Sequence, residues 1–111
     1  MMPTSSQALG GPATRRALSA TEVVTSLTQL EGWSLSGDGH EVAISKGYAF
    51  TSFHETMAFV NAVAYVAHRL DHHPELLITP CSCTVRWRTH DVGGISRRDF
   101  EAAAQVDALL S

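Results

Sequence analysis

Three histidines are the residues of this chain best suited to proton transfer. His72 and His73 are adjacent and precede Pro74, and His90 closes the segment Trp87-Arg88-Thr89-His90. Imidazole is the only side chain whose ordinary pKa, about 6.5, lets it both give and take a proton near neutral pH. The three histidines together predict a site of general acid and base chemistry.

Length and composition predict one small globular domain. The chain has 111 residues, of which 44% are hydrophobic and 17% charged, with a net charge of -3. Its Lys and Arg residues are scattered, so we expect no direct binding to nucleic acid or to an anionic membrane surface. No apolar stretch approaches the roughly 20 residues needed to cross a bilayer. We therefore expect a cytoplasmic protein.

The first segment, residues 1–17, is rich in Ser, Gly, Pro and Ala. It lacks the run of about 7 to 15 apolar residues that marks a signal peptide. We expect a disordered N-terminal tail over residues 1–17 and a folded domain over residues 18–111.

The first half of the domain is predicted to form a helix and a hairpin. The sequence Ser19-Ala20-Thr21-Glu22 has the form of a capping box and precedes apolar residues at helical spacing, which predicts a helix to about Glu31. Residues 33–36 and 42–50 are typical of two strands, with the turn Gly37-Asp38-Gly39 between them.

A second capping box, Ser52-Phe53-His54-Glu55, opens the longest periodic segment of the chain. Pro74 disfavours helical geometry in the residue before it, so this helix should end near His72 or His73. The partial negative charge of a helix C-terminus favours protonated imidazole. The histidine pair is therefore expected where it can hold or lend a proton.

The second half of the domain is predicted to form two strands followed by a helix. Residues 76–79 and 83–89 are typical of strands around Pro80, which places His90 at a strand end. After Gly93-Gly94, the sequence Ser96-Arg97-Arg98-Asp99 resembles a third helix cap. The order α-β-β-α-β-β-α predicts a single α+β domain, with a four-stranded antiparallel sheet and three helices on one face. A catalytic cluster would need the long helix and the last strand to end together.

Other reactive side chains are expected to be structural. Alternation places Cys81 and Cys83 on one face of a strand, and we interpret them as reduced core thiols rather than as a disulfide, redox or metal site. His40 and His54 are expected at the surface. Asp99 is expected to cap the last helix, and both tryptophans to pack in the core.

A metal site is an alternative interpretation of the histidines. His68 and His72 are spaced i, i+4, as two zinc ligands on a helix often are, and His90 could supply a third ligand. No HExxH motif is present and carboxylates with a clear ligand role are missing. We therefore expect no metal.

The histidine motifs resemble those of a known family. The segment Asp71-His72-His73-Pro74-Glu75, followed by Thr89-His90-Asp91, Gly93-Gly94 and Asp99, is similar to the signature of the pterin-4a-carbinolamine dehydratases. Gly32-Trp33 and Phe50-x-x-Phe53 extend the resemblance, which covers roughly residues 18–110. It implies dehydration of 4a-hydroxytetrahydropterin to quinonoid dihydropterin in pterin recycling. It also implies a homodimer or homotetramer and no cofactor, because the pterin is the substrate.

The resemblance also implies roles for individual residues. His72 and His90 would be the general acid and base, while His73 would hold the pterin and assist. The pocket would be lined by Pro74, Thr89, Asp91 and Val92. A non-catalytic binding or assembly protein of the same fold is the alternative function.

Two positions depart from the family pattern. His68 stands where relatives usually have an acidic residue, one helical turn before His72, so a charge that would favour protonated His72 is removed. Leu76 stands where relatives often carry tryptophan, which reduces one wall of the implied pocket.

Overall fold

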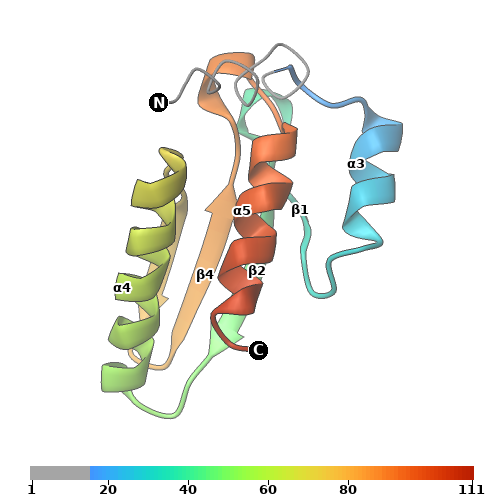
Figure 1. Cartoon of the computed structure of the whole chain (residues 1–111). Helices are drawn as coiled ribbons and strands as arrows, with labels where there is room; N and C mark the ends of the chain where they lie inside the picture. The colour runs from blue at the N-terminus through green and yellow to red at the C-terminus, as the bar shows by residue number, and fades with distance from the viewer. Residues whose placement is uncertain (1–15) are drawn as a thin grey trace.

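The computed structural model describes residues 16–111, and the element labels used below are those of Figure 1. The helices and strands run in the predicted order: α3 (Ala20–Leu27), β1 (Ser34–Ser36), β2 (Ala43–Ala49), α4 (Phe53–Leu70), β3 (Glu75–Thr79), β4 (Ser82–Trp87) and α5 (Arg97–Ala108). Two short 3-10 turns, η1 (Gly39–Glu41) and η2 (His90–Val92), precede β2 and follow β4. Of the tail predicted over residues 1–17, residues 1–15 lie outside the described residues.

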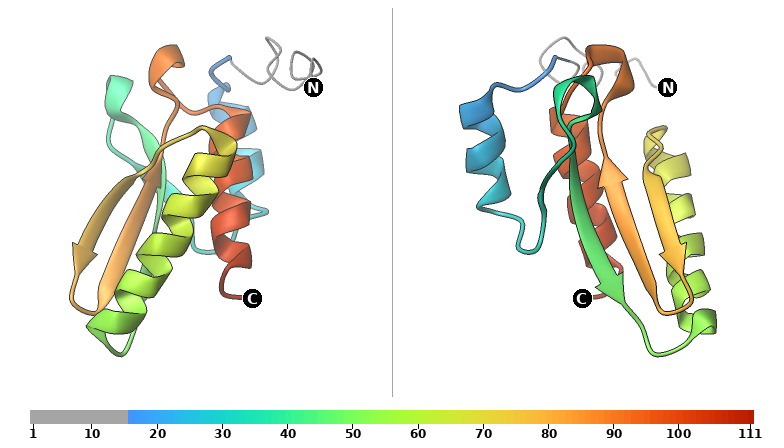
Figure 2. Two further views of the ribbon diagram at one scale, coloured as in Figure 1. Left: turned by 60° about the vertical axis from the view of Figure 1, so that its left-hand side comes forward. Right: turned by 180° about the vertical axis from the view of Figure 1, so that it is seen from behind.

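The strands form one antiparallel sheet in the order β1-β2-β4-β3. The helices lie on one face of it, and the views in Figure 2 show the opposite face uncovered. The expected α+β fold is therefore confirmed. None of the helices within residues 16–111 is both long and apolar enough to cross a membrane.

Strand alternation builds the core against the helices. In β4, Cys83, Val85 and Trp87 are fully buried, whereas the side chains between them face the uncovered side. Both tryptophans are core residues, as predicted. The helices contribute the following buried residues: Val23, Phe59, Val60, Val63, Val66, Ala67, Ala102, Ala103 and Val106.

The predicted helix starts are confirmed by their caps. Ser19 accepts a hydrogen bond from the backbone of Glu22, whose carboxylate accepts from the Ser19 N–H. The start of α5 has the same reciprocal box, between Ser96 and Asp99. At α4 the Ser52 hydroxyl accepts from the Glu55 N–H, although the Glu55 carboxylate turns to Thr51 instead.

Two local predictions were wrong. Helix α3 ends at Leu27 rather than near Glu31, because tight turns from Ser26 to Gln29 and from Leu27 to Leu30 replace its last turn. Leu30 still packs against the core, which explains its helical spacing. Helix α4 ends at Leu70 with Asp71 as its C-cap, so its predicted end near His72 is confirmed. Cys81 lies exposed in the β3–β4 turn and is not a core thiol.

Candidate active site

The backbone at the end of α4 directs the His72 side chain into the protein interior. Asp71 adopts the left-handed conformation, with φ 52° and ψ 46°. The Asp71 N–H donates to the His68 carbonyl at 3.2 Å, and the His72 N–H donates to the Ala67 carbonyl at 3.1 Å. This pattern is a Schellman motif, which ends a helix and redirects the chain. His72 consequently leaves the exposed side of the helix, where His68 lies, and is only 8% exposed.

A buried carboxylate receives the His72 ring. The Nε2 atom of His72 lies 2.6 Å from Oδ1 of Asp99, which is completely buried in the first turn of α5. The second oxygen of Asp99 accepts hydrogen bonds at 2.9 Å from the Thr89 hydroxyl and from the Ser96 N–H. The hydroxyls of Thr89 and Ser96 lie 2.6 Å apart. Both carboxylate oxygens of Asp99 therefore have hydrogen-bond partners.

This network brings together the two chain segments that the sequence predicted at the site and a third, α5, that it did not. His72 follows α4, Thr89 follows β4, and Asp99 belongs to α5. The predicted meeting of the long helix and the last strand is therefore found, and Asp99 is the residue that joins them. The Asp99 carboxylate is in direct contact with the His72 ring.

The hydrogen bond to Asp99 occupies one of the two ring nitrogens of His72. An ionised carboxylate only accepts, so with Asp99 ionised Nε2 carries the hydrogen of this bond and Nδ1 is the nitrogen left for a ligand. The ring also stacks on Trp87, with centroids 5.2 Å apart and an interplanar angle of 24°. Two independent contacts thus fix its orientation. Among residues 16–111, the Nε1 of Trp87 is a buried polar atom without a hydrogen-bond partner.

The other predicted site residues lie around this pair at the surface. His73 and Asp91 are exposed, while Pro74 and Val92 are half-buried. His90 is exposed and begins turn η2, which closes where the Gly93 N–H donates to the His90 carbonyl at 3.1 Å. Within residues 16–111, no hydrogen bond links His73 or His90 to the Asp99 network.

Sequence reasoning missed the role of Asp99 beyond helix capping. A usable signal was present, because Asp99 precedes Ala103 by four positions and Val106 by seven, on the apolar face of α5. A carboxylate on a buried face needs a partner. Its pairing with His72 could have been sought for that reason.

His68 and His72, the helix pair of the metal alternative, do not lie on one helical face. The i, i+4 spacing of His68 and His72 requires a continuous helix, and α4 stops between them. Residues 16–111 contain no group of three or more His, Cys, Asp or Glu side chains placed to hold a metal ion. The two cysteines are free thiols, and burial raises the pKa of Cys83.

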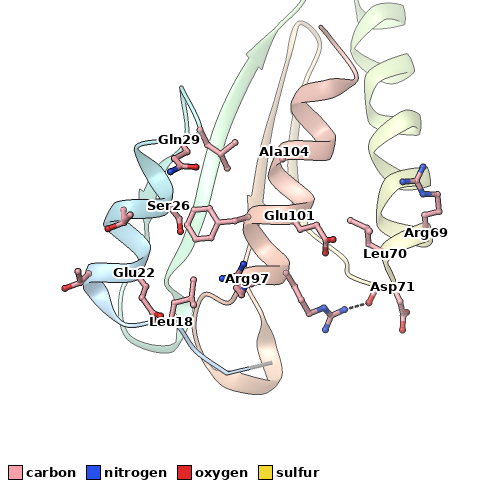
Figure 3. A pocket seen from close by; sticks show the side chains of 15 residues that line it. Leu18, Glu22, Ser26, Gln29, Arg69, Leu70, Asp71, Arg97, Glu101 and Ala104 are labelled. Atoms are coloured by element: carbon pink, nitrogen blue, oxygen red, sulfur yellow. Dashed lines mark hydrogen bonds between the residues drawn. The ribbon is translucent and has the colours of Figure 1, made fainter. Parts of the chain in front are cut away.

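A broad groove of about 1120 Å³ lies beside the site, between α3, α5 and the end of α4 (Figure 3). Its lining includes Leu70, Asp71 and Arg98 but none of the three candidate histidines. Arg98 donates to the Asp71 carbonyl at 2.7 Å, the bond drawn in Figure 3. The groove therefore borders the site, and Arg98 ties the start of α5 to the residue that redirects His72.

Comparison with known proteins shows the family of this chain. The family model described as Pterin 4 alpha carbinolamine dehydratase matches residues 16–109. A protein of Paracidovorax citrulli named "Putative pterin-4-alpha-carbinolamine dehydratase" is 58% identical over 97 residues, covering 87% of this chain and 84% of the relative. A relative of the same name from Bdellovibrio bacteriovorus is 45% identical over 98 residues, covering 85% of this chain and 78% of the relative.

Solved structures show the same fold. A transcriptional coactivator/pterin dehydratase from Brucella melitensis superposes with a TM-score of 0.80 at 27% identity, over 86% of this chain and 100% of that one. A pterin dehydratase-like protein described as a RuBisCO assembly factor in the alpha-carboxysome has a TM-score of 0.60 at 24% identity, over 71% of this chain and 89% of that one, and shows the fold alone. The chain belongs to the pterin 4 alpha carbinolamine dehydratase family, a family of hydro-lyases.

Proposed function

We propose that this protein dehydrates 4a-hydroxytetrahydropterin, such as 4a-hydroxytetrahydrobiopterin, to quinonoid dihydropterin and water during pterin cofactor recycling. The observation that carries the proposal is the buried His72–Asp99 pair, with Nε2 and Oδ1 2.6 Å apart. A protein that served only as a scaffold would gain little from an oriented imidazole in contact with a buried carboxylate. The names of the relatives supply the substrate class.

The reaction needs only proton transfer. The bond between C4a and the hydroxyl oxygen breaks as an acid protonates that oxygen, and a base removes the proton from N5. The N5 lone pair left by that proton forms the new double bond to C4a. Water leaves, and no electrons are gained or lost overall. A positioned acid and a positioned base each typically contribute about 10²- to 10⁴-fold to such a step.

His72 and His90 fit the two proton-transfer roles. His72 would act through Nδ1, because Asp99 occupies Nε2. His90 would act from the exposed turn after β4, and His73 would hold the pterin. Pro74, Asp91 and Val92 would line the pocket, whereas the Thr89 side chain would serve the site through Asp99. No cofactor is required for these steps.

The direct test is the rate at which quinonoid dihydropterin forms from freshly generated 4a-hydroxytetrahydropterin in chelator-treated buffer. We expect rapid turnover that falls by at least about 10²-fold in His72→Ala and in His90→Ala. His54→Ala, which removes an exposed histidine from the first turn of α4, is the matched control. Wild-type protein no faster than buffer would favour the non-catalytic alternative, and activity lost only with chelator would favour a metal site.

We also propose a homodimer formed through β3, the edge strand of the sheet. Its backbone is unpaired on one side, and its side chains include Leu77 at 67% and Ile78 at 39% exposure. An exposed apolar edge strand is a template for pairing with another chain. Two copies of one edge strand can pair in antiparallel orientation about a two-fold axis.

The free thiols Cys81 and Cys83 fit a reducing compartment such as the cytoplasm.

A further inference from the structure

Two loops meet at the end of the sheet that carries His90. One is the β1–β2 connection with turn η1, and the other is the segment after β4 with turn η2. The contact between them is made by His40 and Gly93. A Cβ atom built on Gly93 would stand 3.0 Å from Nδ1 and 3.6 Å from Cε1 of the His40 ring. The imidazole therefore lies directly against the glycine.

Arginine side chains that bind backbone carbonyls hold the segment of His40 in this place. The Arg88 guanidinium donates to the His40 carbonyl at 3.2 Å, and it lies 3.7 Å from the Glu41 carboxylate. Arg86 donates to the Glu41 carbonyl at 3.0 Å and to the Ser36 hydroxyl at 3.0 Å. Two neighbouring arginines, both based on β4 or just beyond it, thus fasten the β1–β2 loop to the strand that leads to His90.

Gly93 in turn fixes the geometry of the His90 turn. It has φ +64°, a conformation that side chains disfavour, and its N–H closes turn η2 on the His90 carbonyl. The carbonyl of the next residue, Gly94, accepts a hydrogen bond from the Thr89 N–H at 2.9 Å. His90 is therefore enclosed by backbone bonds on both sides, and the His40 ring rests on the residue that closes them.

We propose that His40 is a positioning residue for His90: its ring packs on Gly93 and holds turn η2 in the conformation that presents the His90 imidazole. His40 acts through packing, so a flat ring at this position suffices and a titratable one is not needed. The catalytic consequence rests on the proposed dehydratase function, but the structural consequence does not depend on it.

The catalytic test compares His40→Ala, His40→Phe and the control His54→Ala. Because a small misplacement of a catalytic group is costly, we expect His40→Ala to lower kcat by about tenfold with little change in KM. His40→Phe should restore most of the loss, and His54→Ala should resemble wild type. In a His90→Ala background, His40→Ala should have no further effect. Failure of the phenylalanine to rescue, or a full effect without His90, would overturn the proposal.

A second measurement does not require activity. We expect His40→Ala to accelerate amide hydrogen exchange at Gly93 and Thr89 by about tenfold, whereas His54→Ala and His40→Phe should leave both amides near wild-type rates. Unchanged exchange at both amides in His40→Ala would overturn the positioning role even if the wild type is active. Accelerated exchange in a protein with no dehydratase activity would instead retain the role of His40 and reject the proposed function.

Discussion

His72 and Asp99 are 27 positions apart in the chain, yet the imidazole Nε2 and the carboxylate Oδ1 lie 2.6 Å apart in the folded domain. The other oxygen of Asp99 is held by Thr89 and Ser96, so the carboxylate cannot rotate away from the ring. Trp87 stacks on the ring as well. One side chain of the candidate site is thus oriented before any substrate arrives, which is the property that general acid-base catalysis requires.

Asp99→Asn should lower kcat of the proposed reaction by about 10²-fold with little change in KM. The amide has nearly the shape of the carboxylate but no charge, and its nitrogen can only donate. It can therefore favour the ring tautomer with the hydrogen on Nδ1, the wrong one for the proposed role. Steady-state kinetics with the same substrate provide the measurement.

Glu101→Gln is the matched control for this substitution, because Glu101 is an exposed carboxylate two residues further along α5. It should leave kcat unchanged. An Asp99→Asn protein that turns over at the wild-type rate would show that the pair serves stability alone.

A second carboxylate predicts how stability depends on pH. Asp107 accepts hydrogen bonds from the Trp33 indole at 3.0 Å, from Lys46 at 2.9 Å and from the Tyr48 hydroxyl at 2.6 Å. Desolvation alone would raise the pKa of Asp107, but the bonds from Tyr48, Lys46 and Trp33 together lower it below the ordinary value. The unfolded carboxyl, with a pKa of about 3.9, binds a proton more readily.

The stabilisation from Asp107 should therefore be complete above about pH 4 and lost as the pH falls through the lower folded pKa. Asp107→Asn should reduce the free energy of unfolding by about 1–3 kcal/mol at pH 7, where the charged acceptor is fully present. As the pH falls below about 4, the difference between the variant and the wild type should shrink. Urea unfolding at pH 7 and in this acidic range checks this, and a constant difference between the two proteins would contradict it.

Asp71→Gly should stabilise the protein slightly, by up to about 1 kcal/mol, without reducing activity. Asp71 is the one residue other than glycine with a positive φ among those that the structure describes. Its two helix-ending contacts are made by backbone atoms, so glycine retains them. Thermal unfolding measures the effect. Asp71→Ala, which keeps a Cβ but loses the local polar group, should be less stable than either.

The sequence predicted features that depend on neighbouring residues. The capping serines Ser19, Ser52 and Ser96 are recognisable because each cap uses groups within three positions. The inward alternation of Cys83, Val85 and Trp87 is equally local. The family motif then placed His72 and Thr89 in one region, and the structure joins them through Asp99.

What could not be predicted depends on distant contacts or on a single backbone angle. The left-handed conformation of Asp71 separates His68 from His72, although their spacing is that of one helical face. Cys81 and Cys83 have the spacing of one strand face, but the strand begins only at Ser82. Leu30 follows Leu27 at helical spacing, but it lies in a tight turn after the end of α3. In each case the spacing along the chain is that of one element, but the chain turns before or within that spacing.

Three glycines differ in how much strain an added Cβ atom would cause. A Cβ on Gly37, where φ is +75°, would stand 2.5 Å from the Glu41 carbonyl oxygen. At Gly39, φ is +57° with nothing within 4 Å, and at Gly47 the nearest atom is the Thr84 hydroxyl at 3.7 Å. Gly39→Ala should cost about 1–2 kcal/mol and Gly37→Ala more, whereas Gly47→Ala should be neutral or slightly stabilising. Chemical denaturation gives the ranking, and equal losses at Gly37 and Gly39 would exclude the clash.

The final prediction concerns the edge strand β3. Leu77→Lys should convert the proposed dimer to a monomer, because an antiparallel pair of β3 strands centred near this residue would bring two ammonium groups together. Light scattering of the two proteins at equal concentration measures their masses. The monomer should remain folded, since Leu77 is 67% exposed and contributes little to the core.

Val24→Lys supplies the matched control for Leu77→Lys. Val24 is 57% exposed on α3, which lies on the opposite side of the domain from β3 (Figure 2), so its substitution adds the same charge without touching the proposed interface. The mass of this variant should equal that of the wild type. A wild-type protein that is monomeric at high concentration, or a Leu77→Lys protein that keeps the wild-type mass, would mean that β3 is not the contact. Because His73 and Pro74 immediately precede β3, loss of pairing that also weakens pterin binding would place the interface next to the active site.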